Sequence, residues 1–122
     1  GYVDQRDAAA PPLDEIICRG SNLGCRVVLF DTWNKASGNI FDHLDVPDLR
    51  GFRQTANALG MNFVLAGSVR NDCLSAVAEV APQVVGVRGA ACHKFQRGAT
   101  IDGLMLSRFR SRLNDVQRFR RP

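Results

Sequence analysis

Three short apolar runs constrain the fold of this chain most strongly. They span residues 26–32, 62–68 and 84–90, and each ends in polar residues or glycine. Near-continuous runs of Val, Leu and Phe are typical of strands covered on both faces, as in parallel sheets, whereas a one-sided antiparallel sheet shows clean alternation. The three runs therefore predict parallel strands.

The segment between the first two runs has the periodicity of an amphipathic helix. Within residues 46–59, four apolar side chains recur on one helical stripe: Leu49, Phe52, Ala56 and Leu59. Asp45 can cap this helix, and Gly60 can end it. The segment is thus expected to cross from the first strand to the second.

Three further helices are expected. One runs from about Pro12 to Leu23, and a short one begins at Asn71 or Asp72, either of which can cap it, and ends before Pro82. The last helix is Arg-rich and carries one apolar stripe: Ile101, Met105, Phe109, Leu113 and Val116.

Strands and helices therefore alternate, which with right-handed crossovers fits a doubly wound sheet or part of a (βα)8 barrel. A Rossmann-type unit needs a G-x-G-x-x-G turn after its first strand, and no such spacing occurs here. A closed barrel needs about 250 residues, whereas this chain has 122. We expect an α/β fold in which residues 1–122 form one partial TIM (βα)8-barrel domain whose N-terminal half is absent. A start at Gly1 without an initiator Met favours a fragment.

Small residues follow two of the predicted strands, as Gly67-Ser68 and Gly89-Ala90. Such residues let backbone N–H groups approach a phosphate, and barrels often bind phosphate after their last two strands. Tight turn geometry explains either glycine when it is taken singly. The matched positions favour a phosphate site.

Asp31 and Lys35 are the candidate catalytic residues. Alternation along the first strand places Val27, Leu29 and Asp31 on one side, so that Asp31 points into the barrel mouth. Lys35 follows four residues later and can reach the same cavity. The pair is suited to proton transfer or charge stabilisation, and a surface salt bridge is the alternative.

Cysteine spacing and hydropathy exclude some classes of protein. The four cysteines form no C-x-x-C pair and have only His93 nearby, so we expect no metal site and reduced, mostly buried thiols, as in a reducing cytoplasm: Cys18, Cys25, Cys73 and Cys92. No apolar run approaches the roughly 20 residues of a membrane span. We expect a cytoplasmic protein with no membrane partner.

The net charge of +4 comes largely from arginines near the end of the chain: Arg108, Arg110, Arg112, Arg118, Arg120 and Arg121. A solvated helix face is the favoured interpretation. Nucleic-acid binding is the alternative, but no aromatic stacking residues form a recognisable module. We therefore expect no nucleic-acid partner.

Four ordered blocks resemble one enzyme family. They are Leu-Phe-Asp-Thr-x-x-Lys-x-x-Gly at 29–38, Phe-Asp-His-Leu at 41–44, Leu-Ala-Gly-Ser at 65–68 and Val-Gly-Val-Arg-Gly-Ala-Ala-Cys at 85–92. Together they resemble the (5-formylfuran-3-yl)methyl phosphate synthase family. The resemblance runs from residues 1–4, which look like the end of the family's fifth strand, to its last helix.

The resemblance implies a TIM-barrel enzyme that forms a homodimer or larger assembly and condenses two molecules of glyceraldehyde 3-phosphate into a furan aldehyde phosphate for methanofuran or methylofuran. The implied chemistry is that of an aldolase-like carbon–oxygen lyase acting on phosphates, with no cofactor and no metal. In the family, a lysine of the N-terminal half is thought to form a Schiff base with the substrate. That half is not in this chain, which alone is expected to be inactive.

The resemblance also assigns site residues. Asp31 and Lys35 match the family's C-terminal catalytic Asp and Lys. Its phosphate-binding loops match five residues here: Gly67, Ser68, Arg88, Gly89 and Ala90. Trp33 and Asn34 depart from the smaller, apolar residues expected between Asp31 and Lys35. Two alternatives remain, a half-barrel subunit that pairs with a separate N-terminal half or with itself, and a polyanion-binding module without catalysis of its own.

Overall fold

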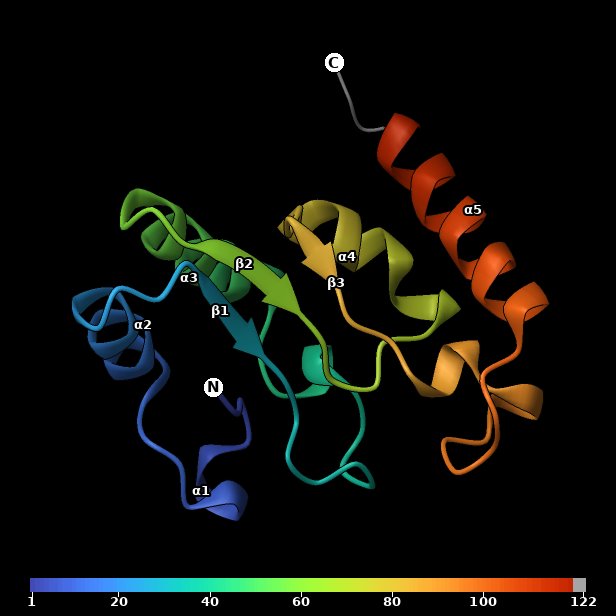
Figure 1. The fold of residues 1–122 in the computed structure, drawn as a ribbon, viewed down its shortest axis with the longest axis horizontal. Coiled ribbons are helices and arrows are strands. Elements are labelled where there is room, and N and C mark those ends of the chain that lie inside the picture. The colour runs from blue at the N-terminus through green and yellow to red at the C-terminus, as the bar shows by residue number, and fades with distance from the viewer. Residues whose placement is uncertain (120–122) are drawn as a thin grey trace.

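The sheet of this chain contains the three predicted strands, paired in parallel and in chain order. In a computed structural model that describes residues 1–119, they are β1 (Val27–Phe30), β2 (Asn62–Leu65) and β3 (Val84–Val85) (Figure 1). Val28 pairs with Phe63, and Leu65 pairs with Val85. The predicted strands are confirmed, but each is shorter than its apolar run because the last residues of the run already lie in a loop.

The first residues of the chain lie beside β1 as a further parallel pairing. Tyr2 forms a parallel bridge with Asp31. The Asp31 N–H donates to the Gly1 carbonyl at 3.0 Å, and the Val3 N–H donates to the Asp31 carbonyl at 3.0 Å. Residues 1–3 thus occupy the strand position that precedes β1, and α1 (Gln5–Ala8) follows them.

The larger helices are α2 (Leu13–Asn22), α3 (Val46–Ala58), α4 (Leu74–Val80) and α5 (Gly103–Phe119). Each packs against the next, α2 on α3, α3 on α4 and α4 on α5. Figure 1 shows them along one side of the sheet. The layer of helices therefore follows the order of the strands.

The core lies between the sheet and this helical layer. Phe30 packs edge-on against Phe63 and Phe52, with ring centroids 4.9 and 5.3 Å apart. β1 alternates as expected, since Val28 and Phe30 are buried while Val27 and Leu29 are 52% and 44% exposed. The side of the sheet away from the helices thus presents apolar side chains to solvent.

Helix ends confirm two predicted signals and contradict a third. The Asp45 carboxylate accepts from the Asp48 N–H at 2.8 Å, and Gly60 adopts a positive φ of 77° after α3. Neither Asn71 nor Asp72 caps α4, so that prediction was wrong. Both residues lie within a 3₁₀ turn, η2 (Asn71–Cys73), which precedes the helix.

The apolar stripe predicted for the last helix is correct except at its start. Ile101 is 62% exposed and forms an antiparallel bridge with Cys92, so it precedes the helix. Asp102 caps α5, and the backbone N–H groups of Met105 and Leu104 lower the pKa of its carboxyl. The side chain that faces the core from α5 is Phe109, which is 4% exposed.

The cysteines are free as predicted, but only two of them are buried. Cys18 and Cys25 are exposed rather than buried.

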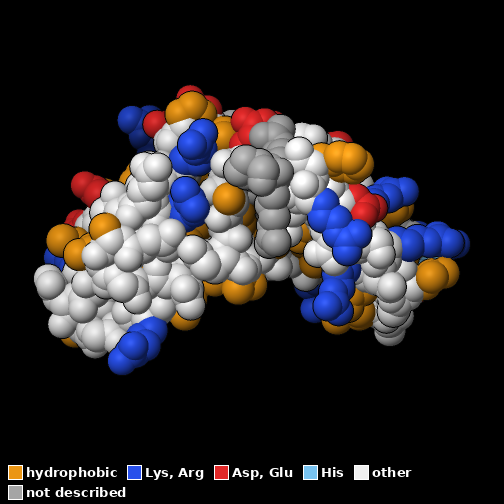
Figure 2. Space-filling view, turned by 90° about the horizontal axis from the view of Figure 1, so that it is seen from above, with side chains coloured by type: hydrophobic (Ala, Val, Ile, Leu, Met, Phe, Trp, Pro, Cys, Tyr) orange, Lys and Arg blue, Asp and Glu red, His pale blue; other side chains and the backbone are white. Residues whose placement is uncertain are grey.

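Figure 2 shows basic side chains gathered over α5, where four arginines are exposed: Arg108, Arg110, Arg112 and Arg118. Arg120 and Arg121 lie outside the described residues. Within residues 1–119, no helix is long and apolar enough to cross a membrane.

Candidate functional site

A cavity of about 440 Å³ lies at the carboxyl ends of the strands. The carboxyl ends of parallel strands meet at one edge of a sheet, so segments distant in sequence converge there. All the predicted site residues line this cavity: Asp31, Lys35, Gly67, Ser68, Arg88, Gly89 and Ala90. Their catalytic and phosphate-binding roles stay predictions.

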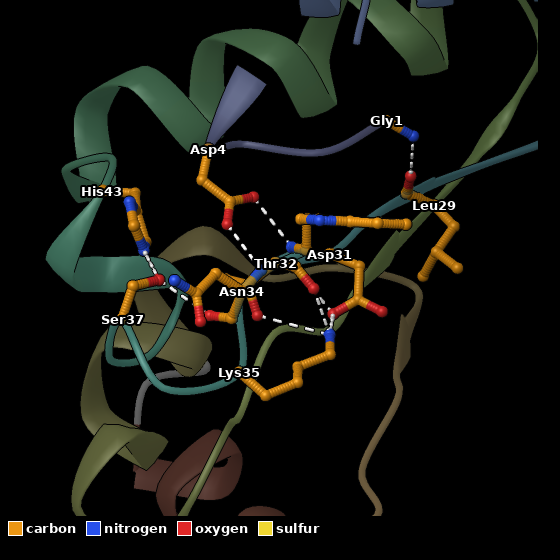
Figure 3. A network of polar contacts seen from close by, with 10 residues as sticks. Gly1, Asp4, Leu29, Asp31, Thr32, Asn34, Lys35, Ser37 and His43 are labelled. Atoms are coloured by element: carbon orange, nitrogen blue, oxygen red, sulfur yellow. Dashed lines mark hydrogen bonds and ion pairs between the residues drawn. The ribbon is translucent and has the colours of Figure 1, made fainter. Parts of the chain in front are cut away.

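Asp31 and Lys35 form an ion pair at the cavity wall (Figure 3). The Lys35 ammonium lies 2.6 Å from Asp31 Oδ1 and also donates to the carbonyl of Thr32. The two side chains are only 28% and 29% exposed, and Thr32 is fully buried. The pair is therefore a partly buried, backbone-anchored one rather than a salt bridge on open surface.

Asp4 fixes the loop that carries Lys35. Its carboxylate is 8% exposed and accepts hydrogen bonds from the backbone N–H groups of Trp33 and Asn34, both at 2.8 Å (Figure 3). Burial raises the pKa of the Asp4 carboxyl, but these two N–H donors, together with smaller contributions from its own N–H and from His43, hold the pKa below its ordinary value. The carboxylate thus stays charged and fixes the chain directly before Lys35.

Asp4 was not among the predicted site residues, although the sequence holds a signal for it. Asp4 is the last residue of the segment Gly-Tyr-Val-Asp, and Asp31 is the last residue of Leu-Phe-Asp. The two segments lie side by side in parallel, so each carboxylate comes at the end of a strand-like segment. Trp33 lies outside the cavity lining, and its ring packs edge-on against Tyr2 with centroids 5.3 Å apart. The departure from small residues at this position thus falls outside the cavity.

The turn after β2 requires a glycine. Gly67 has a φ of +101°, and a Cβ there would lie 3.0 Å from the Ile40 Cβ and 3.2 Å from the Thr32 nitrogen. Ser68 is also left-handed, with a φ of +53°. This turn thus requires glycine for steric reasons and also lines the cavity.

The segment after β3 contributes a short 3₁₀ turn, η3 (Gly89–Ala91), to the lining of the cavity. Gly89 has no steric need for its small size, since the nearest atom to an added Cβ is the Phe95 carbonyl oxygen at 3.9 Å. Among the described residues, the N–H groups of Gly67, Ser68, Gly89 and Ala90 have no acceptor. Such free N–H groups around a cavity are suited to an anion.

The cavity is lined by four cationic side chains and one carboxylate, that of Asp31. Two of the cations, Arg70 and Arg97, were not among the predicted site residues. Within residues 1–119, no carboxylate forms a salt bridge with Arg70, Arg88 or Arg97. The signal for Arg70 is its position two residues after Ser68, in the same strand-end segment. This excess of positive charge favours an anionic ligand.

Metal-ligating side chains are not gathered in the part of the chain that the structure describes. No group of three or more His, Cys, Asp or Glu residues there has a geometry that could hold a metal ion.

Comparison with known proteins gives one consistent result. The family model described as 4-HFC-P synthase matches residues 1–110. A (5-formylfuran-3-yl)methyl phosphate synthase of Methanobrevibacter smithii is 36% identical over 75% of this chain and 39% of its own length. Proteins of the same name from Methanococcus maripaludis and Methanocaldococcus jannaschii are 38% and 35% identical, over 81% and 75% of this chain. The chain spans about two fifths of the length of these curated relatives, 39% to 42%.

Proposed function

Because the chain belongs to the 4-HFC-P synthase family, we propose that it supplies one side of the active site of a (5-formylfuran-3-yl)methyl phosphate synthase. One observation carries this proposal. The Asp31–Lys35 pair, the two glycine turns and an excess of arginine surround a single cavity at the carboxyl ends of the strands. In barrel enzymes this face is where active sites lie.

The proposed substrate is glyceraldehyde 3-phosphate, of which two molecules condense to the furan aldehyde phosphate that serves methanofuran or methylofuran. A volume of about 440 Å³ suits a small metabolite. In this proposal the free N–H groups of the two turns bind the phosphate, and the neighbouring arginines supply positive charge around it. The reaction forms a carbon–carbon bond and releases one phosphate and two molecules of water, which makes it aldolase-like in its first part and a carbon–oxygen lyase reaction in its second.

Lys35 and Asp31 would transfer and stabilise charge during these steps. Lys35 is held by Asp31 and Thr32, so its ammonium is positioned to donate a proton to a leaving or carbonyl oxygen, and the Asp31 carboxylate stabilises the protonated form of Lys35 before the transfer. The Schiff-base lysine of the family is proposed to come from the N-terminal half of the barrel. No cofactor is required in this scheme.

The architecture supports a partial (βα)8 barrel that spans residues 1–122. The strands are adjacent in chain order, and the helices lie on one side, whereas a doubly wound sheet has helices on both sides. The exposed residues Val27, Leu29 and Val84 would then face the interior of the barrel. We propose that the other strands come from an N-terminal half, in a homo-oligomeric enzyme of the cytoplasm.

Replacement of Asp31 tests the catalytic proposal. In the protein that carries this chain, Asp31→Asn should lower kcat about 100-fold or more, because Lys35 loses its charged partner, while phosphate binding stays intact. The matched control is Asp115→Asn, an exposed carboxylate on α5. Unchanged turnover in Asp31→Asn would return this residue to a structural role.

A further inference from the structure

The segment after η3 forms a closed loop, residues 92–101, beside the cavity. An antiparallel bridge joins Cys92 to Ile101 at its base. The His93 N–H donates to the Thr100 carbonyl at 3.0 Å, and the Asp102 N–H donates to the Ala91 carbonyl at 2.8 Å. The two ends of the loop are thus fixed to each other.

This loop reverses direction through two consecutive left-handed residues, Lys94 and Phe95, with φ of 50° and 57°. Left-handed backbone is unfavourable for residues other than glycine and persists where surrounding contacts impose it. Beyond the reversal, the loop returns to the cavity, and Phe95 and Arg97 both line it. The loop therefore presents a cationic side chain to the anion site described above.

Arg88 and Arg97 differ in what their guanidinium groups contact. Arg88 Nε donates to the backbone carbonyl of Arg97 at 3.0 Å, so Arg88 joins the end of the third strand segment to the loop. The Arg97 side chain has no hydrogen bond or ion pair among residues 1–119. Arg88 thus has a structural partner, while Arg97 carries an unpaired charge at the cavity.

We propose that Arg97 is an anion-binding residue of this cavity and that Arg88 is the positioning residue that holds Arg97 there. The ligand class is a phosphate monoester, and in this respect the inference rests on the proposed function. A planar guanidinium suits the bidentate contact that a phosphate offers. An arginine on a loop that is already held by hydrogen bonds loses less conformational freedom on binding than one on a mobile loop.

Three variants separate the two roles. Arg97→Gln should weaken binding of inorganic phosphate, measured by calorimetry on the whole protein, by about 10-fold to 100-fold, the range for a charge-assisted hydrogen bond. Arg88→Lys keeps the positive charge but removes the Nε–H donor, and it should weaken binding to a similar extent. The control Arg110→Gln removes an exposed charge on α5 and should leave binding unchanged.

Hydrogen exchange gives the second readout. Arg88→Lys should speed amide exchange within residues 92–101, because the Arg97 carbonyl loses its donor. Arg97→Gln should not, since only its carbonyl takes part in that contact. In turnover, Arg97→Gln should raise KM for glyceraldehyde 3-phosphate more than it lowers kcat, as expected for a contact that binds the substrate and the transition state alike.

The outcomes are distinguishable. If the unmodified protein binds phosphate and Arg97→Gln binds it equally well, the assignment of Arg97 is wrong while the proposed function stands. If Arg88→Lys binds phosphate normally with unchanged exchange, Arg88 is not a positioning residue. If the unmodified protein binds no phosphate, both this inference and the proposed function fail.

Discussion

At the scale of single residues, the Asp4 carboxylate determines how the loop before Lys35 is held. Its pKa is lowered in the folded chain, so its contribution to stability is present above the ordinary Asp pKa of about 4 and is lost as the pH falls through the lowered value. Asp4→Asn should cost about 1–3 kcal/mol near neutral pH, because two backbone N–H groups lose a charged acceptor.

The measurement is urea unfolding of both proteins at a series of pH values from neutral into the acid range. The free energy of unfolding of the unmodified chain should fall at acid pH, and the difference between it and Asp4→Asn should shrink there. Asp115→Asn, which alters an exposed carboxylate, should show no such difference. A constant difference across the series would mean that the charge of Asp4 does not matter.

Gly67 offers a second test at this scale. Gly67→Ala places a Cβ against Ile40 and Thr32 on a residue whose backbone φ is positive. In the matched variant Gly24→Ala the backbone φ is also positive, at 77°, but the added Cβ meets nothing within 4 Å. The left-handed cost alone is about 1 kcal/mol. Gly67→Ala should exceed Gly24→Ala by about 1–2 kcal/mol in thermal or urea unfolding. Equal losses would show that the cavity turn relaxes freely.

Sequence reasoning placed Asp31 and Lys35 at the cavity because period and spacing specify where they lie, while their roles stay predictions. Alternation along the first strand places Asp31, and the spacing of four places Lys35. Asp4 was missed because its partners, Trp33 and Asn34, are distant in sequence and are contacted through the backbone. The position of Asp4 at the end of a strand segment was the available signal, but its hydrogen bonds to main-chain N–H groups cannot be read from the identity of the residues it contacts.

At the scale of elements, local patterns predicted the strands and most of each helix. The loop 92–101 was not foreseen, because the bridge from Cys92 to Ile101 is a long-range pairing without a periodic pattern. Ile101 was for this reason placed on the last helix. Asn71 and Asp72 were likewise expected to cap α4, but both lie within the 3₁₀ turn η2 that precedes it.

The basic face of α5 carries its own prediction. Its four described arginines are exposed: Arg108, Arg110, Arg112 and Arg118. Phe109, which lies between two of them in sequence, is buried and cannot stack on bases. We expect a solvated face, so the protein should show no salt-dependent binding of a labelled DNA duplex by fluorescence anisotropy. Affinity that falls steeply between about 50 and about 200 mM salt, as the release of counterions from neutralised phosphates requires, would support the polyanion-binding alternative.

At the scale of the whole molecule, the uncovered face of the sheet sets how this chain behaves on its own. Val27, Leu29 and Val84 are between 44% and 52% exposed, although strands of parallel sheets are normally covered on both faces. The 122-residue chain alone should therefore associate, with a mass above 13.4 kDa in light scattering, and should form no furan product. A stable monomer with robust turnover would contradict both expectations.

The α/β class with a parallel sheet was predictable from the alternation of strand and helix patterns, which is a local property. Closure into a barrel was not, because it depends on strands that this chain does not contain. The order β1-β2-β3 and the one-sided helices are what a barrel wall requires. They favour the barrel and leave its closure as part of the proposed function.

The most direct measurement is product formation from glyceraldehyde 3-phosphate by the protein isolated from its source, followed by mass spectrometry of (5-formylfuran-3-yl)methyl phosphate. The unmodified protein should form this product, Lys35→Ala should lose at least about 100-fold in rate, and Arg110→Gln should match the unmodified protein. Absence of product from the unmodified protein, or equal rates with and without Lys35, would contradict the assignment of this cavity as an active site.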